Sequence, residues 1–547
     1  MMGSKLKFQV SSAKLTMLLA LFLVVFHNNS FWRAVLKVFE TTWSEHIGFI
    51  VAIFVALVVF LNLVFTLLSG RYLLKPIAML IVIAASFASH FMDSYGVLID
   101  RDMMLNLAQT GLGEVLELVN FKMIVNVILL GFLPAGLIYY TDIDRSSGVK
   151  RFVRLKVVFI SLLIMVSIAG VFFQEFASMV RNERHLRWLI APINFTYAIG
   201  SLTKRALTSG PVVVKAIDAQ GREKREGEKK RLVILIVGET ARAKNFSVNG
   251  YSRNTNPVLS TEEIISFTNV SSCGTATTTS VPCMFSKFTR DNYSHEKGRS
   301  NENLVDALTH AGVKVLWREN NSDCKGVCNR IETDVFVDRD THECVNMDYA
   351  RFCPSGEGYD ILLLHKLNEF VSGLKTDSLI VLHQKGSHGP AYYLRYPKEF
   401  NIFFPVCETS QLQDCNSSEI INGYDNTIRY TDYFIGQTIG FLKQNSRQFD
   451  TAMIYASDHG ESLGENNIYL HGLPYMIAPK EQTHIPMILW MSKGFGKTGF
   501  KENCLAEKKN QPLTHDNIFH SVLGLMDVQA DDYSPGLDFF ASCRLKR

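Results

Sequence analysis

The distribution of apolar residues divides the chain into two parts. Up to residue 174, long uncharged stretches alternate with short polar loops, and beyond residue 205 charged, glycine and turn residues are spread as in a water-soluble domain. Each stretch is close to the roughly 20 residues that a helix needs to cross a bilayer. The five predicted spans are Leu15 to Trp32, Ile47 to Gly70, Pro76 to Met92, Met123 to Thr141 and Val157 to Gln174.

The basic residues of the loops give these spans an orientation. With the N-terminus inside, the cytoplasmic segments hold ten Lys and Arg, from Lys5 to Lys156, and the opposite short loops hold four, from Arg33 to Lys122. This bias follows the positive-inside rule and places everything after Gln174 outside the cytoplasm. A cleaved signal peptide is the alternative for the first stretch, although no small-residue cleavage site follows it.

The cysteines indicate the same compartment. All ten follow residue 270, and eight form close pairs. Short-range pairs suit disulfides in an oxidising compartment; the alternative is zinc binding, but the spacings do not follow the regular CxxC pattern of zinc ribbons. The expected bridges are Cys273–Cys283, Cys324–Cys328, Cys344–Cys353 and Cys407–Cys415, with Cys504 and Cys543 paired by elimination.

The second part of the chain predicts an α/β domain. Short β-branched runs at residues 232–237, 313–317, 378–382, 452–456 and 485–490 alternate with helical patterns at 303–310, 360–371, 424–442 and 515–526. This alternation favours a mostly parallel sheet covered by helices on both faces. We expect a transmembrane domain with interfacial helices over 1–207, a polar linker over 208–231 and a soluble domain over 232–547. The net charge of only +4 gives no support for a nucleic-acid partner.

Polar side chains follow four of the predicted strands. Glu239 follows the first, Arg318 to Asp323 the second, His383 to Pro390 the third, and Asp458-His459 the fourth. Because active sites of parallel sheets lie beyond the carboxyl ends of the strands, these groups should gather at one edge. Carboxylates mixed with imidazoles suit Zn²⁺. For Asp458 alone, a helix N-cap is the alternative.

A serine and threonine tract, residues 273–283, lies between two cysteines. Such tracts are usually turns, which is what we expect here. A hydroxyl beside a divalent cation becomes a usable nucleophile, because the cation stabilises the alkoxide. Spacing does not say which hydroxyl attacks.

Six short motifs occur in order along the chain. They are Gly238-Glu239-Thr240, Cys273-Gly274-Thr275, Ser280-Val281-Pro282-Cys283-Met284, Gly386-Ser387-His388-Gly389-Pro390, Ser457-Asp458-His459-Gly460-Glu461 running on to Asn466, and Tyr469-Leu470-His471-Gly472. This ordered set resembles the lipid A phosphoethanolamine transferases, the group that includes the mobile colistin-resistance enzymes. The resemblance covers nearly the whole chain and implies a five-helix transmembrane bundle with an alkaline-phosphatase/sulfatase-like domain in the periplasm.

The resemblance also implies roles for individual residues. Thr277 matches the nucleophile of the family, although Thr278 and Thr279 add neighbouring hydroxyls, and Glu239, Asp458 and His459 match its zinc ligands together with Thr277. The histidines expected to bind a second zinc or the substrate phosphate are His383, His388 and His471. The residues expected to contact the substrate in the soluble domain are Asn321, Ser322 and Lys325. In the membrane half they are Asn106, Thr110 and Glu114, for which capping of an interfacial helix is the alternative.

The activity implied is a two-step transfer of phosphoethanolamine from phosphatidylethanolamine to a lipid A phosphate, with polymyxin resistance as a consequence. The cofactor would be one firmly bound Zn²⁺, with a second during turnover, and the protein is expected to be a monomer in the inner membrane. The alternatives are a same-fold phosphoethanolamine or phosphoglycerol transferase acting on another envelope glycan, a sulfatase, and a non-enzymatic membrane scaffold or transporter. The nucleophile loop lacks the C/S-x-P-x-R motif of sulfatases, and the intact Glu239, Thr277, Asp458 and His459 argue against a scaffold.

Overall fold

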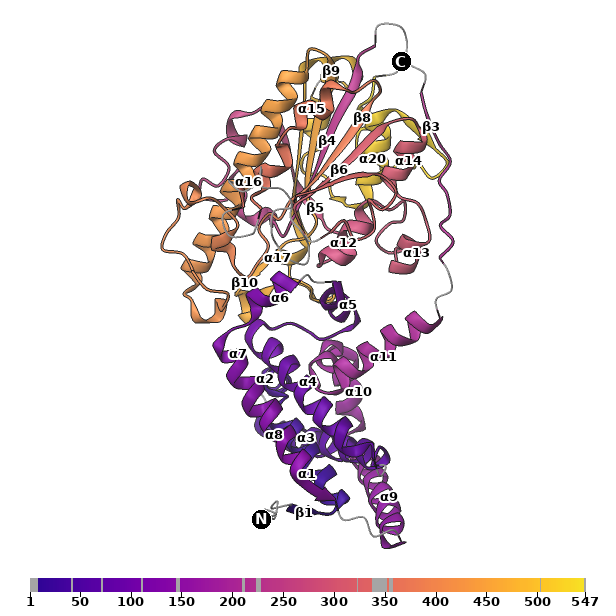
Figure 1. The fold of residues 1–547 in the computed structure, drawn as a ribbon, viewed down its shortest axis with the longest axis vertical. Coiled ribbons are helices and arrows are strands. Elements are labelled where there is room, and N and C mark those ends of the chain that lie inside the picture. The colour runs from indigo at the N-terminus through magenta and orange to yellow at the C-terminus, as the bar shows by residue number, and fades with distance from the viewer. Residues whose placement is uncertain are drawn as a thin grey trace, which may run out of the picture. The chain divides into compact units, whose positions relative to one another are not determined.

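The chain folds into two compact units. The computed structural model describes residues 8–40, 43–69, 72–109, 112–143, 148–208, 212–222, 228–321, 323–336, 352–353, 358–501 and 503–545. One unit consists of Met1–Met104 with Val119–Ala206, and the other of Leu105–Leu118 with Leu207–Arg547 (Figure 1). The short segment between two predicted spans therefore groups with the soluble part of the chain.

The first unit is a set of helices that match the predicted apolar stretches. Four helices in the described residues are long and apolar enough to cross a membrane, or five if a bent pair is counted as one span. The helices are α1 (Ser12–Phe26), α2 (Asn29–Val38), α3 (Trp43–Leu67), α4 (Leu74–Tyr95), α7 (Phe121–Val127), the π-helical turn η1 (Ile128–Phe132), α8 (Leu133–Tyr140), α9 (Gly148–Val171), α10 (Phe173–Asn182) and α11 (Ile193–Thr208).

The first predicted span is not one straight helix, because α1 and α2 meet at an angle of 62°. The buried side chain of Asn28 lies at the bend. Its amide donates to the Leu23 and Ala191 carbonyls at 2.8 and 3.0 Å, and its oxygen accepts from the Ala191 N–H at 2.8 Å. These bonds tie the bend between α1 and α2 to the backbone at Ala191, 163 positions along the chain.

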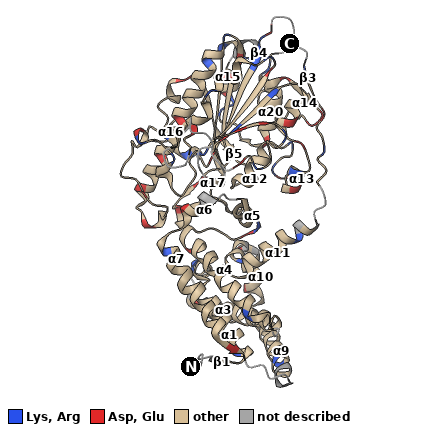
Figure 2. Cartoon of the chain, viewed as in Figure 1, with Lys and Arg blue, Asp and Glu red and all other residues tan. Residues whose placement is uncertain are grey.

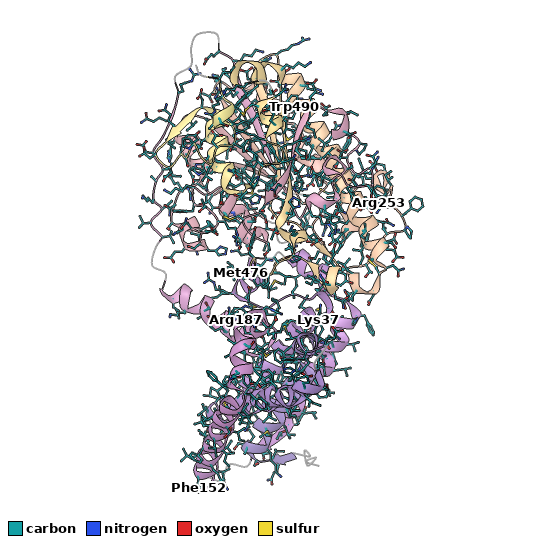
Figure 3. All side chains as sticks on the ribbon, turned by 180° about the vertical axis from the view of Figure 1, so that it is seen from behind. Lys37, Phe152, Arg187, Arg253, Met476 and Trp490 are labelled. Carbon is teal, nitrogen blue, oxygen red and sulfur yellow. A yellow bond between two sulfur atoms is a disulfide. The ribbon has the colours of Figure 1, made fainter. Side chains whose placement is uncertain are left out.

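The surface of the first unit is apolar, as a lipid-facing surface must be. Figure 2 shows few charged residues along α1, α3 and α4 and many across the second unit. On α9 the side chain of Phe152 is 73% exposed and projects outward (Figure 3).

The second unit is built on an eight-stranded sheet, and the predicted mostly parallel α/β fold is confirmed. Its order is β13-β5-β12-β9-β4-β8-β6-β7, and only β12 runs antiparallel to its neighbours β5 and β9. The strands are β4 (Lys230–Gly238), β5 (Ile264–Ser271), β6 (Lys314–Glu319), β7 (Glu332–Val335), β8 (Ser378–His383), β9 (Phe449–Ser457), β12 (His484–Met491) and β13 (Leu513–Thr514).

Helices cover both faces of this sheet (Figure 1). Alternate residues of β4 enter two separate cores: Val233 and Leu235 pack with α14 (Leu304–His310) and α20 (Asp516–Met526), whereas Leu232 and Ile234 pack with α15 (Leu367–Ser372) and α16 (Ser417–Asn445). This two-residue alternation explains why β4 is a continuous apolar run.

The helix predicted over 360–371 is interrupted. A 3₁₀ turn covers Asp360–Leu364 and α15 begins only at Leu367, because Lys366 adopts a left-handed conformation with φ of 54°. Strands β5, β7 and β13 were not predicted.

Four of the five expected disulfides are present in the described residues. They are Cys273–Cys283, Cys324–Cys328, Cys407–Cys415 and Cys504–Cys543. Cys344, the expected partner of Cys353, lies outside the described residues.

Candidate active site at the sheet edge

Two neighbouring strands place the predicted metal ligands together. Strands β4 and β9 are parallel and in register, with Gly238 opposite Ser457, so the residues that follow them emerge side by side. The Asp458 N–H extends this pairing by donating to the Gly238 carbonyl at 2.9 Å. Glu239, Asp458 and His459 are all fully buried at this edge.

Thr277 is the first residue of a helix, so the expectation of a turn was wrong. Helix α12 covers Thr277–Met284, with Ala276 as its N-cap. The N-terminus of a helix carries partial positive charge and open N–H groups, which favour an anion at this position. The Cys273–Cys283 bridge ties the residues before the helix to its last turn.

The hydroxyl of Thr277 points into the carboxylate and imidazole cluster. Its Oγ1 lies 3.2 Å from each carboxylate oxygen of Glu239 and 3.4 Å from His459 Nε2. The neighbouring hydroxyls have other surroundings: Thr279 Oγ1 contacts His295 at 3.3 Å, and Thr278 Oγ1 is buried without a hydrogen-bond partner among the described residues.

The cluster has the donor set and the lone pairs that a cation requires. His459 Nδ1 lies 2.9 Å from the Gly460 carbonyl, which can only accept, so this nitrogen carries the proton and Nε2 presents a lone pair. Nε2 lies 3.2 Å from Asp458 Oδ2 and 3.5 Å from Glu239 Oε1. Asp458 Oδ2 is buried and receives no hydrogen bond from the described residues. Three ligand atoms therefore face one another without protons between them, and the residues fit a zinc ion.

Burial has consistent effects on the pKa values of these groups. Burial raises the pKa of Asp458 to about 6. Burial and the Asp458 charge raise the pKa of Glu239, and burial with the nearby His471 charge lowers the pKa of His459 to about 3. A bound divalent cation would reverse the penalty on both carboxylates, because it favours their ionised form.

Two of the three additional histidines lie beside this cluster. The His471 ring is 4.3 Å from that of His459 and 5.6 Å from that of His388, between ring centroids. His471 Nδ1 also contacts Glu461 Oε2 at 2.9 Å, and Tyr392 donates to the other oxygen of Glu461 at 2.7 Å. Glu461 is fully buried and was not singled out from the sequence, although it follows Asp458-His459 by two positions.

His383 has different contacts. Its Nδ1 lies 2.8 Å from Glu319, and its Nε2 lies 3.4 Å from the amide of Asn321. The Asn321 amide in turn donates to Glu239 at 2.7 Å. His383 therefore reaches the metal ligands through Asn321, whereas His388 and His471 face each other.

A further buried histidine, His515, connects the loop before Thr277 to the sheet. His515 Nδ1 accepts from the Cys273 N–H at 3.1 Å, and Nε2 donates to the Ser457 carbonyl at 2.9 Å. His515 is the N-cap residue of α20, and a polar residue is common at that position, so no feature of the sequence indicated this contact.

A pocket of about 760 Å³ opens beside the cluster. It is lined by Thr278, Asn321, Asp323 and Lys325, among others, and the Lys325 side chain is 5% exposed. Cys324–Cys328 closes the loop that carries Lys325. Of the other predicted substrate contacts, Asn106 lies in α5 (Arg101–Gln109) and Glu114 in α6 (Leu112–Leu118), whereas Ser322, Thr110 and the side chain of Glu114 lie outside the described residues.

Comparison with known proteins first assigns the second unit to a superfamily of enzymes. The family model described as Sulfatase matches residues 231–528, which include residues of all eight strands of the sheet. The second unit therefore belongs to the alkaline-phosphatase-like superfamily.

A second family model, which matches the membrane half, identifies the family within this superfamily. The model described as Phosphoethanolamine transferase EptA/EptB matches residues 57–207. The chain belongs to this family of phosphoethanolamine transferases. It is 37% identical to phosphoethanolamine transferase EptA of Escherichia coli K12 (96% of each chain covered) and 38% identical to phosphatidylethanolamine transferase Mcr-1 of Escherichia coli (95% of this chain, 96% of the relative).

A solved structure supports the same assignment. The integral membrane protein lipooligosaccharide phosphoethanolamine transferase A from Neisseria meningitidis superposes with a TM-score of 0.93 at 35% identity, covering 98% of this chain and 100% of that one. The chain is thus a multi-pass protein of the bacterial inner membrane with a periplasmic catalytic domain. The loop charges and cysteines predicted the extracytoplasmic side, and the family resemblance implied the periplasm.

Proposed function

We propose that this protein transfers phosphoethanolamine from phosphatidylethanolamine to a phosphate of lipid A, with Thr277 as the nucleophile. The observation that carries the proposal is the position of the Thr277 hydroxyl, 3.2 Å from Glu239 and 3.4 Å from His459 at the N-terminus of α12. Attaching an amine to an anionic phosphate would weaken the attraction of the outer membrane for cationic peptides, so polymyxin resistance would follow.

The proposed cofactor is one zinc ion held by Glu239, Asp458, His459 and Thr277. When bound, it would lower the pKa of the Thr277 hydroxyl and offset charge on the phosphoryl oxygens. His388 and His471 are proposed to bind the substrate phosphate or a second zinc, and Glu461 orients His471 through its hydrogen bond.

The proposed reaction has two steps, and side chains of this protein take part in both. Thr277 Oγ1 is proposed to pass its proton to the Glu239 carboxylate, 3.2 Å away, and to form a bond to phosphorus as the bond from phosphorus to the diacylglycerol oxygen breaks. His471 is proposed to give that oxygen a proton. An oxygen of the lipid A phosphate is then proposed to attack the phosphorus of the phosphoethanolamine-threonine as the bond from phosphorus to Thr277 Oγ1 breaks. Thr277 takes back the proton held by Glu239, and the proton of the acceptor phosphate returns to His471. Asn321, Ser322 and Lys325 are proposed to hold the substrate headgroup at the pocket described above.

The membrane half is proposed to contain five crossings, with the bent pair α1 and α2 acting as one. We further propose a transmembrane domain over 1–207, a linker over 208–231 and a catalytic domain over 232–547 in a monomer, with Asn106, Thr110 and Glu114 near the donor headgroup. A family member acting on another envelope glycan would use the same nucleophile and differ only in its acceptor.

Mass spectrometry of lipid A from cells that express the protein tests the proposal. The wild type should add phosphoethanolamine, Thr277→Ala should abolish the addition, and Thr279→Ala, a matched loss of a neighbouring hydroxyl, should preserve it. An adduct that persists in Thr277→Ala would remove Thr277 from its role. Modification of another glycan, with lipid A unchanged, would support the alternative acceptor.

A further inference from the structure

A buried ion pair joins the segment between two membrane spans to the catalytic site. Arg395 Nη2 lies 2.7 Å from Glu117 Oε2, although the residues are 278 positions apart. The Arg395 side chain is 1% exposed and that of Glu117 16%. Glu117 belongs to α6, which follows α4 and precedes α7 in the chain, and α6 groups with the catalytic unit.

The same arginine supports the loop that carries His388. Arg395 Nε donates to the His388 carbonyl at 2.7 Å. Arg395 directly follows the 3₁₀ turn Tyr392–Leu394, and the Tyr392 hydroxyl donates to Glu461, the partner of His471. One short turn therefore connects α6 with both histidines beside the metal cluster.

The burial of Arg395 distinguishes this ion pair from an exposed one on the protein surface. Exposed pairs contribute little, whereas a guanidinium that is almost fully covered needs its carboxylate and carbonyl partners, because an unpaired buried charge is costly. The planar fork of arginine also fixes direction as well as distance, so it holds two separate segments in a defined register.

We propose that Glu117 and Arg395 are positioning residues that hold α6 in register with His388 and His471, so that a lipid phosphoester is presented to Thr277. This inference rests on the proposed function. It assigns the pair a role in the use of a membrane-held donor, which a small water-soluble phosphodiester would not need.

Two substrates separate this role from a merely structural one. The full-length protein in mixed micelles is assayed for diacylglycerol release from phosphatidylethanolamine and for nitrophenolate release from 4-nitrophenyl 2-aminoethyl phosphate. Glu117→Gln should lower kcat/KM for the lipid by about tenfold, mainly through KM, because one charge-assisted hydrogen bond is lost. Its turnover of the soluble ester should fall less than about twofold. Arg395→Gln should lower both activities, because it also releases the His388 carbonyl.

The controls keep the outcomes distinct. Glu262→Gln removes a carboxylate from an ion pair with the exposed Lys443 and should change neither activity. Glu117→Asp keeps the charge and should regain part of the lipid activity. Equal losses on both substrates in Glu117→Gln, or no loss on the lipid, would overturn the inference. A wild type that releases no diacylglycerol would instead reject the proposed function.

Discussion

Replacing Asp458 with asparagine should stabilise the zinc-free protein and abolish its response to zinc. Asp458 Oδ1 accepts from the Thr240 and His459 N–H groups at 3.1 and 2.7 Å, and asparagine can keep both bonds. Its amide would replace Oδ2, which lies 3.2 Å from the His459 Nε2 lone pair. A repulsive contact between two acceptors would become a hydrogen bond.

The size of this effect follows from the electrostatics of the buried carboxylate. Burial raises the pKa of Asp458 from 3.8 to about 6, so ionising it at neutral pH costs about 3 kcal/mol relative to the unfolded chain. The folded-state pKa is the higher one, so the contribution of Asp458 to stability is full below pH 3.8 and is lost as the pH rises through about 6. A neutral asparagine avoids this loss. The zinc-free variant should therefore be about 3 kcal/mol more stable than the zinc-free wild type at pH 7.5.

The assay is unfolding of the purified full-length protein in detergent, with EDTA or with added zinc, at pH 4 and 7.5. Zinc should stabilise the wild type but not Asp458→Asn, because the variant has lost a ligand, and elemental analysis should find the variant depleted of zinc. Asp291→Asn, on an exposed side chain, controls for the change in net charge. If Asp458→Asn destabilises the EDTA-treated protein, or still gains the wild-type stabilisation from zinc, the assignment of these lone pairs to a metal site is wrong.

Two further predictions concern the surroundings of the site. Gly386 has φ of +55°, and a Cβ there would lie 2.7 Å from the Glu239 carbonyl oxygen, so Gly386→Ala should lower both zinc affinity and stability. The control Gly312→Ala, at φ of +79° in open space, should lower stability by only about 1 kcal/mol and leave the zinc content unchanged. Equal effects of the two variants would contradict this reasoning. Burial lowers the pKa of His515 to about 4, so its contribution to stability is present above pH 6.5 and is lost as the pH falls through 4, by up to about 3 kcal/mol. Denaturant unfolding from pH 7.5 to 4 should show this loss in the wild type and a smaller one in His515→Gln; identical pH dependence in the two would contradict it.

The sequence was sufficient to predict that Glu239, Asp458 and His459 lie together, because two local features combine there. Glu239 and Asp458 each follow a continuous apolar run, and two parallel strands that end together place such residues at one edge. The roles proposed for Thr277 and the histidines rest on the family resemblance, since hydroxyl and imidazole spacing alone did not choose among them.

Other features depend on contacts between distant positions. The pairing of Glu117 with Arg395 crosses 278 residues, and His515 contacts Cys273, 242 residues away. The bend at Asn28 depends on hydrogen bonds to Ala191, which the apolar pattern does not encode. Local propensity also missed the start of α12, because serine and threonine favour turns as readily as helix N-termini.

The covalent step is tested most directly by trapping the phosphoethanolamine-threonine in the absence of acceptor. The purified protein is incubated with phosphatidylethanolamine alone, digested and examined by tandem mass spectrometry. We expect one phosphoethanolamine group on Thr277, lost when lipid A is added and absent from Thr277→Ala. Diacylglycerol release without any modified threonine, or a modification on Thr278 or Thr279, would contradict the proposed mechanism.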